Sequence, residues 1–245
     1  MTLFVDIGNS RLKWSAYGQR RSHSALYTVA TLREQLASAW KGLQSPEAVY
    51  IANVAGTEVA DIVSQYSRAN WNREPVFMAV SKNFHGLVNA YEDSRQMGVD
   101  RWMALVAGWS AYKDNLCVVD FGTAITVDLV LADGRHLGGY ILPGMQLMQD
   151  LLNRHTYGIK IDAGESSGIN PGRSTSECLG NGARLAVIAL IERVVKESGK
   201  EYDCDFKCII TGGGADAFRG LLTLPFEHDQ DLVLRGMAIV SGDDQ

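Results

Sequence analysis

The chain contains the same short pattern twice, and each copy is an apolar run that ends in Asp-x-Gly and leads into a second strand-like run. The first copy is LFVDIGNSRLKW at residues 3–14, and the second is CVVDFGTAITVDL at residues 117–129. Asp6 and Asp120 occupy the same place in the two copies. Such an internal repeat predicts two duplicated domains that face each other across a cleft.

Length and composition are those of an ordinary globular protein, with 245 residues, 46% of them hydrophobic and 21% charged. The formal net charge is −5 and no run of five basic residues occurs, so we expect no nucleic-acid partner. The start shows no secretory leader pattern, and no apolar stretch is long enough for a membrane span. We therefore expect a soluble, cytoplasmic protein. The four scattered cysteines favour free thiols over a closed zinc site.

Short apolar strands alternate with amphipathic helices along the chain, which predicts an α/β fold. We expect strands at 3–6, 11–17, 48–52, 75–80, 116–120, 124–131 and 207–210, and helices at 32–40, 57–70, 99–112, 145–152, 176–198, 215–222 and 231–240. A polar loop is expected at 165–173. The predicted domains are residues 1–108 and 109–245, each a mixed β-sheet flanked by helices.

The two repeated turns have the chemistry of phosphate-binding loops. Gly8 and Gly122 are expected to adopt a positive φ and to let a ligand approach, while the following turn N–H groups suit phosphate oxygens. Asp6 and Asp120 would lie beside these phosphates, which requires a cation such as magnesium between them. Lys13 could reach a phosphate as a point charge. A pair of ordinary β-hairpins is the alternative, but the repetition favours phosphate binding.

The turns DIGNS and DFGTA resemble the phosphate motifs of the superfamily of acetate and sugar kinases, Hsp70 and actin, whose domains have a ribonuclease H-like (actin-like ATPase) fold. ITGGGADAF at 210–218 resembles its adenosine motif, and a plain strand-to-helix turn explains it equally well. Within this superfamily, the whole chain resembles the type III pantothenate kinases. The resemblance is carried by the ordered set DIGNSRLKW, GVDRW, DFGTAITVD, GGYILPGM, STSE and TGGGA. No Walker A pattern occurs, which argues against a P-loop kinase.

The resemblance implies ATP-dependent phosphorylation of pantothenate to 4′-phosphopantothenate, the first step of coenzyme A biosynthesis, by a homodimer with its substrate site at the interface. It implies that ATP is bound by Asp6, Ile7, Gly8, Asn9, Ser10, Arg11, Leu12, Lys13 and Thr123. Asp6 would also contact the magnesium that accompanies ATP. Asp120 would hold a monovalent cation, potassium or ammonium.

The motif GVDRW at residues 98–102 carries the resemblance that points to the substrate. Asp100 opens a helix, where an aspartate often serves only as a cap or dipole partner. Arg101 opposes the helix dipole in the first turn, so we expect it to have another partner. The resemblance implies that Asp100 is the general base for the pantothenate hydroxyl. It also implies that pantothenate is bound by Tyr91, Gly98, Val99, Asp100, Arg101 and, from the partner subunit, Thr175.

Several of these positions have a second interpretation. Tyr91 could be an ordinary half-buried aromatic residue, and the proline that family members often carry between this tyrosine and the glycine is missing here. Thr175 could cap the helix that begins near Ser176. The apolar helices at 99–112 and 176–198 could mediate dimerisation or simply pack on their own sheets.

Two other functions fit part of the pattern. One is a sugar-type kinase of the same superfamily, although many of these are longer and many zinc-dependent ones carry a Cys/His cluster that this sequence lacks. The other is a non-catalytic ATP-binding regulator with this fold, in which Asp100 would be unnecessary. An assay of ATP turnover with pantothenate against a panel of sugars separates these functions.

Overall fold

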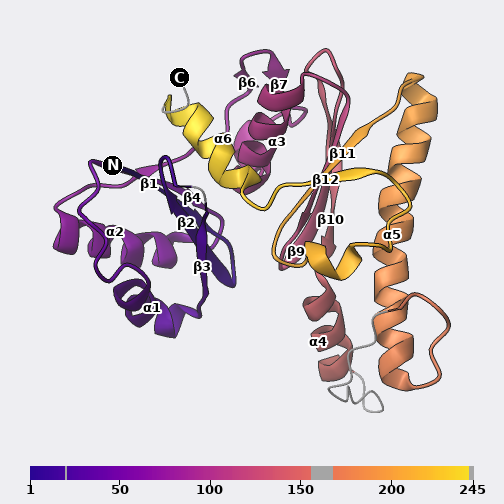
Figure 1. Cartoon of the computed structure of the whole chain (residues 1–245), viewed down its shortest axis with the longest axis horizontal. Coiled ribbons are helices and arrows are strands. Elements are labelled where there is room, and N and C mark those ends of the chain that lie inside the picture. Colours follow the sequence, from indigo (N-terminus) through magenta and orange to yellow (C-terminus); the bar gives the residue numbers. More distant parts are fainter. Residues whose placement is uncertain (20, 156–167, 243–245) are drawn as a thin grey trace. The chain divides into compact units, whose positions relative to one another are not determined.

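The computed structural model describes residues 1–19, 21–155 and 168–242, which form an α/β structure built around two five-stranded sheets (Figure 1). The chain divides into two compact units. The first is Met1–Tyr112 together with the C-terminal segment that begins at Asp231, and the second is Lys113–Gln230.

The sheet of the first unit has the order β3-β2-β1-β4-β5, with β1 antiparallel to β2 and parallel to β4. Its strands are β1 (Thr2–Ile7), β2 (Arg11–Ala16), β3 (His23–Leu26), β4 (Ala48–Asn53) and β5 (Val76–Phe77). A small hairpin pairs β6 (Asn83–Phe84) with β7 (Leu87–Val88). The helices are η1 (Val29–Thr31), α1 (Leu32–Ala39), α2 (Thr57–Trp71), η2 (Ser94–Gln96), α3 (Val99–Tyr112) and α6 (Leu232–Ser241).

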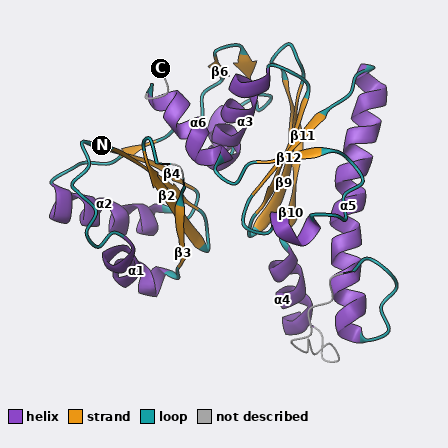
Figure 2. Ribbon diagram, viewed as in Figure 1, coloured by secondary structure: helices purple, strands orange, loops and turns teal. Residues whose placement is uncertain are grey.

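Alternation along β1 directs its side chains to the two faces of the sheet. Leu3, Val5 and Ile7 are fully buried and pack with apolar residues of α1 and α2. The intervening residues, Phe4 and Asp6, point to the opposite face because successive strand residues alternate. Helix α6 packs on β1 and β4, and Figure 2 shows it with α3 on the other side of this sheet from α1 and α2. Asp6 therefore lies on the face that α3 and α6 cover.

The second unit repeats this arrangement, with the sheet order β10-β9-β8-β11-β12, β8 antiparallel to β9 and parallel to β11. Its strands are β8 (Leu116–Phe121), β9 (Ala124–Val130), β10 (His136–Pro143), β11 (Lys207–Thr211) and β12 (Phe226–His228), and its helices are α4 (Met145–His155), α5 (Thr175–Tyr202) and η3 (Ala215–Phe218). Buried residues of α5 pack on Val119 and Phe121 of β8. Two sheets of the same order and strand directions confirm the predicted fold class.

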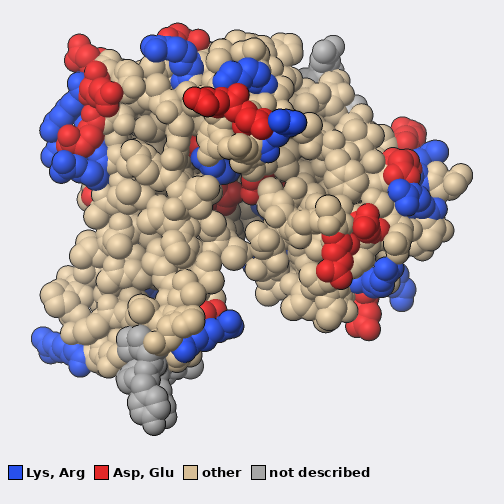
Figure 3. Space-filling view, turned by 180° about the vertical axis from the view of Figure 1, so that it is seen from behind, with Lys and Arg blue, Asp and Glu red and all other residues tan. Residues whose placement is uncertain are grey.

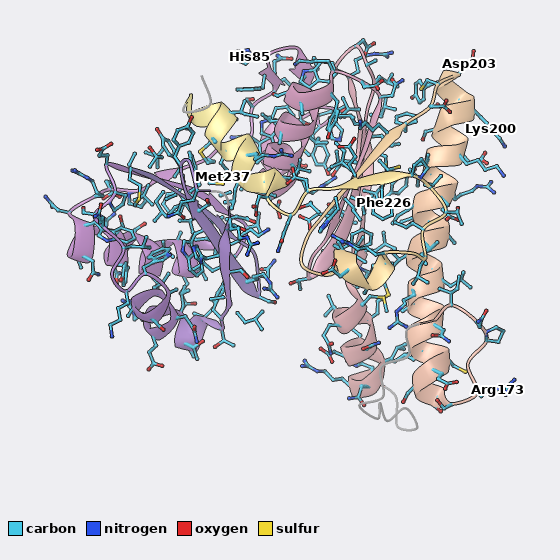
Figure 4. All side chains as sticks on the ribbon, viewed as in Figure 1. His85, Arg173, Lys200, Asp203, Phe226 and Met237 are labelled. Atoms are coloured by element: carbon cyan, nitrogen blue, oxygen red, sulfur yellow. The ribbon has the colours of Figure 1, made fainter. Side chains whose placement is uncertain are left out.

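Helix α6 groups with the first unit, whereas the predicted division places residues 109–245 in the second domain. The physical reason is close packing of α6 on α3. A Cβ atom added to Gly236 would overlap the main chain of Met103, 2.6 Å from its carbonyl carbon. Met237, which Figure 4 labels on α6, is fully buried beside this contact. The division at residue 108 stays a prediction, from which the compact units differ.

Several predicted elements are shorter in the structure, and some strands were not expected. The predicted helix at 215–222 is only the 3₁₀ turn η3, and the predicted strand at 75–80 is only β5. Strands β3, β6, β7 and β12 were missed because each has only two to four residues, too few for alternation to show. The predicted loop at 165–173 lies partly outside the described residues.

The surface carries mixed charge. On the face in Figure 3, Lys and Arg side chains lie interspersed with Asp and Glu. Among the described residues, no helix has both the length and the apolar character required to cross a membrane.

The packing of α6 on α3 predicts that Gly236→Ala lowers the free energy of unfolding of the first unit by about 1–3 kcal/mol, because the methyl group forces the two helix backbones apart. All five tryptophans are buried in the first unit, so urea unfolding followed by tryptophan fluorescence reports this unit.

Gly182→Ala is the matched control, since a Cβ at this position in α5 meets no other atom within 4 Å. It should leave the fluorescence midpoint unchanged and not destabilise α5 as followed by circular dichroism. An unchanged midpoint for Gly236→Ala would contradict the packing.

Candidate functional site

The first repeated turn joins β1 to β2. Asp6 lies opposite Lys13 in the antiparallel register, which puts both side chains on the same face of the sheet. The Gly8 N–H donates to the Arg11 carbonyl at 3.0 Å and closes a four-residue turn. Asn9, Ser10 and Arg11 are exposed there. Of the predicted ATP-binding residues, Ile7 and Leu12 have fully buried side chains and can offer a ligand only main-chain atoms.

Tyr27 holds this turn through two hydrogen bonds, although no sequence motif indicated this residue. Its hydroxyl donates to the Gly8 carbonyl at 2.6 Å, and its main-chain N–H donates to the Ser10 carbonyl at 3.2 Å. Burial, and then the negative charge of Asp6, raises the pKa of the Tyr27 hydroxyl. The phenol therefore stays protonated at neutral pH and remains a donor to the turn.

Lys13 takes part in a short network with Ser22 and with Asp231, which is distant in sequence. Its Nζ lies 3.5 Å from Oδ1 of Asp231, and the Ser22 hydroxyl donates to the same carboxylate oxygen at 2.5 Å. The Lys13 side chain is only 13% exposed. The ammonium group is thus held on the face that carries Asp6.

The second repeated turn joins β8 to β9 and is one residue shorter than the first. Asp120 lies opposite Thr126 of β9 and Thr211 of β11, two hydroxyl-bearing residues that lie within the quoted motifs but were given no role there. The Gly122 N–H donates to the Ala124 carbonyl at 3.1 Å. Thr123 is exposed at the tip of the turn.

Two glycine-containing loops pack directly on this second turn. The Gly144 N–H donates to the Thr123 carbonyl at 2.8 Å, and the Gly214 N–H donates to the Phe121 carbonyl at 2.8 Å. A Cβ on Gly212 would overlap the Asp120 carboxylate and the Phe121 main chain. The motif at residues 210–218 therefore contributes to the architecture of the turn, beyond a plain strand-to-helix connection.

The prediction that Gly8 and Gly122 adopt a positive φ is wrong, since neither is among the glycines in that region. Both turns close through main-chain hydrogen bonds, with φ values at Gly8 and Gly122 that residues other than glycine can also adopt. A Cβ on Gly122 would come within 3.2 Å of the Ala124 carbonyl, so its constraint is close packing. Gly212, at φ +91°, is the glycine near the turn that requires the left-handed region.

Five of the six predicted substrate-binding residues lie together, at the start of α3 or in contact with it. The Asp100 Oδ1 accepts the main-chain N–H of Arg101 at 2.8 Å. This carboxylate folds back over Gly98, where a Cβ would lie 2.5 Å from Oδ1. Arg101 is 6% exposed, donates through Nη1 to the Tyr91 hydroxyl at 3.0 Å, and stacks over its ring. This is the other partner expected for Arg101. Val99 is the first residue of the helix.

The loop between Tyr91 and Gly98 is ordered without the proline that family members often carry. Buried Asn89 accepts the Tyr91 N–H at 2.9 Å, and the Lys82 ammonium donates to the Tyr91 carbonyl at 2.7 Å. Asp93 then caps η2 by accepting the Arg95 N–H at 3.1 Å. These contacts fix Tyr91 by other means.

Thr175 is exposed at the start of α5 and does not cap it. The cap is Ser174, one residue earlier, whose hydroxyl accepts the Glu177 N–H at 3.2 Å. Glu177 in turn accepts the N–H of Arg173, which Figure 4 labels just before the helix, at 2.7 Å. The capping interpretation of Thr175 is therefore wrong.

Tyr27 should stabilise the first turn measurably. Tyr27→Phe removes one hydrogen bond and should lower the free energy of unfolding by about 1 kcal/mol at pH 8. Because the pKa of Tyr27 is raised in the folded state, the unfolded chain loses this proton first, so the stabilisation declines as pH rises above about 10. Urea unfolding of both proteins at several pH values checks this.

Tyr66→Phe is the control, since the Tyr66 hydroxyl has no hydrogen-bond partner in the part of the chain that the structure describes; we expect a change below about 0.5 kcal/mol at pH 8. A difference between wild type and Tyr27→Phe that widens above pH 10 would contradict the assignment.

The sequence of this chain is similar to those of known proteins over most of its length. The family model described as type III pantothenate kinase matches residues 2–197. A type III pantothenate kinase of Nitrosococcus oceani is 39% identical over 253 residues, which cover 99% of this chain and 94% of that protein.

Two solved structures share the fold. One is a Campylobacter jejuni protein described as a Baf family transcriptional activator, with a TM-score of 0.61, 21% identity and coverage of 99% of this chain and 98% of that one. The other is a Sinorhizobium meliloti protein described as a 2-dehydro-3-deoxygalactonokinase, with a TM-score of 0.58, 12% identity and coverage of 100% and 99%. These structures establish likeness of fold alone, whereas the sequence matches span the chain. The chain therefore belongs to the type III pantothenate kinase family.

Proposed function

We propose that this chain is an ATP-dependent kinase that phosphorylates the terminal hydroxyl of pantothenate to give 4′-phosphopantothenate, the first step of coenzyme A biosynthesis. Family membership over the whole chain carries the reaction class. The observation that carries the substrate site is the grouping of Tyr91, Gly98, Asp100 and Arg101 at the start of α3. Localisation in the cytoplasm stays a prediction from sequence.

Asp100 is the general base in this proposal. Phosphoryl transfer needs positioning, charge neutralisation and one group that orients the attacking hydroxyl. The Asp100 carboxylate accepts the hydroxyl proton while the hydroxyl oxygen bonds to the γ-phosphorus and the bridging oxygen leaves with ADP. Its hydrogen bond from the Arg101 N–H orients the carboxylate at the start of α3. Arg101 is a buried cation suited to an anionic substrate such as pantothenate.

The two turns bind ATP in this proposal. Residues 6–13 supply Asp6, the main-chain groups of Ile7, Gly8 and Leu12, the exposed Asn9, Ser10 and Arg11, and the Lys13 ammonium, and the second turn supplies Thr123. The carboxylate of Asp6 fits magnesium, which neutralises phosphate charge when bound. The carboxylate of Asp120, with the hydroxyl-bearing Thr126 and Thr211 on either side, is an oxygen-rich surrounding that fits potassium or ammonium.

Homodimerisation is part of the proposal, with Thr175 reaching the substrate of the partner subunit. Helix α3 buries its apolar residues within the chain, so it offers no apolar face for this purpose. Exposed apolar side chains instead gather on β10, α4 and α5 of the second unit: Tyr140, Ile141, Leu147, Leu151, Leu152 and Leu185. Exposed apolar side chains grouped on neighbouring elements mark interaction surfaces, which favours α5 over α3 as the dimer helix.

Asp100→Asn should lower kcat by about 10²-fold or more, because general-base assistance is lost, while the affinity for ATP is kept. Coupled ADP release with pantothenate, and ATP binding by calorimetry, check the two halves of this statement.

Asp61→Asn, at an exposed position of α2, is the control that removes the same charge without effect. Normal turnover by Asp100→Asn would show that Asp100 is not the general base and only complements the dipole of α3. Turnover by the wild type with a sugar of the panel, and none with pantothenate, would instead favour the sugar-type kinase.

Asp120→Asn should raise the potassium concentration needed for half-maximal turnover about tenfold or more, since a charge-assisted contact contributes roughly 1.5–3 kcal/mol. Turnover is measured against potassium with ionic strength held constant by sodium. Asp133→Asn, which alters an exposed aspartate paired with Arg135 in the same unit, should keep the wild-type response. Wild-type turnover that is indifferent to potassium would remove this role from Asp120.

Leu185→Glu should convert the dimer to a monomer and lower turnover together, because Thr175 of the partner subunit is then missing from the site. Sedimentation equilibrium and steady-state kinetics on the same samples measure both. Val76→Glu, at an exposed apolar position of β5, should remain dimeric and active. A fully active wild-type monomer would overturn the role of Thr175.

A further inference from the structure

Asp231 immediately precedes α6, at the position where an aspartate side chain commonly caps a helix. Its side chain makes no capping hydrogen bond to α6. Its Oδ1 instead accepts the Ser22 hydroxyl at 2.5 Å and lies 3.5 Å from Nζ of Lys13. The carboxylate thereby joins the start of the last helix to the first sheet.

Lys13 needs such an anchor if its charge is to act at one place. It extends from β2 on the face shared with Asp6, and its side chain is 13% exposed. A lysine side chain has four rotatable carbon–carbon bonds and loses much conformational freedom when its ammonium group is fixed. An ion pair formed within the folded protein fixes the ammonium group before a ligand arrives.

We propose that Asp231 is a positioning residue that holds the Lys13 ammonium in place for a phosphate group of ATP. This inference rests on the proposed role of Lys13 in ATP binding. An ammonium group has three N–H donors, so it can contact the Asp231 carboxylate and a phosphate oxygen at once. Asp231 acts through Lys13 and makes no contact with ATP itself.

The anchor is itself fixed by the packing of α6. Gly236 of α6 lies directly on the main chain of Met103 in α3, and α3 carries Asp100 in its first turn. The helix that places the Asp231 carboxylate beside Lys13 is therefore packed on the helix that presents Asp100. Within the first unit, α6 links the group proposed to bind ATP with the group proposed to accept the substrate proton.

Whether Asp231→Asn strengthens or weakens ATP binding distinguishes a positioning role from simple charge repulsion. A carboxylate near a triphosphate repels it, so an aspartate with only a Coulombic effect would weaken ATP binding, and Asp231→Asn would strengthen it. A positioning aspartate has the opposite effect. We expect Asp231→Asn to weaken the affinity for ATP, measured by calorimetry without pantothenate, by about five- to tenfold.

A double-mutant cycle with Lys13→Gln separates positioning from a general structural effect. If Asp231 acts through Lys13, Asp231→Asn should change the affinity for ATP less than about twofold in the Lys13→Gln background. Glu47→Gln is the control of equal charge change, since Glu47 pairs with the N-terminal ammonium group in the same unit and is exposed. It should leave the affinity for ATP unchanged.

Ser22→Ala tests the same network if Asp231→Asn does not fold. It removes the hydrogen bond that orients the Asp231 carboxylate and should weaken ATP binding about two- to threefold, again only when Lys13 is present. Unchanged or tighter ATP binding by Asp231→Asn, or an equal loss in the Lys13→Gln background, would overturn the proposal. Because the readout is ATP binding alone, failure to phosphorylate pantothenate would reject the proposed function without deciding this point.

Discussion

Close contact between main chains, with no side chain between them, is the constraint on which the functional parts of this structure depend. Gly236 brings α6 onto the main chain of Met103, and Gly144, Gly212 and Gly214 bring two loops onto the turn that follows Asp120. Gly98 leaves room for the Asp100 carboxylate to fold back. At Gly98, Gly144, Gly212 and Gly236 a methyl group would overlap a main-chain atom or a carboxylate, and at Gly214 it would come within 3.0 Å of the Phe121 carbonyl. These glycines therefore fix positions by close packing.

The two repeated turns have diverged in length and in support. The first has three residues between its strands, and the hydroxyl of Tyr27 donates a hydrogen bond to it. The second has two, and main-chain N–H groups of two glycine-containing loops donate hydrogen bonds to it. The residues opposite the aspartates also differ, a lysine for Asp6 and threonines for Asp120. At the first turn the positive charge comes from the Lys13 side chain. At the second turn the oxygen atoms of Asp120 and its threonine neighbours suit a bound cation.

The residues proposed to bind the substrate show how the start of a helix can position catalytic groups. Asp100 lies in the first turn of α3, where its negative charge complements the helix dipole. This agrees with its interpretation as a dipole partner. Its Oδ1 is held by the Arg101 N–H, and the Arg101 side chain is held by Tyr91. The stabilising and the functional interpretations of Asp100 are thus compatible, because a carboxylate ordered by a main-chain donor is already oriented for a hydroxyl.

The sequence by itself determined the α/β class, the duplication, the long helices and the residues of the motifs, because apolar periodicity and repeated turn chemistry are local signals. The tertiary structure decided what depends on distant contacts. Tyr27, Ser22 and Asp231 gave no local signal, since Tyr27 acts on the turn between β1 and β2, and Ser22 and Asp231 meet only when α6 packs on the first sheet. Helix α6 has the pattern of any apolar helix, and only the close fit of Gly236 on Met103 placed it with the first unit. Local periodicity cannot encode which partner a helix will have, because that choice is made by complementary surfaces far apart in the chain.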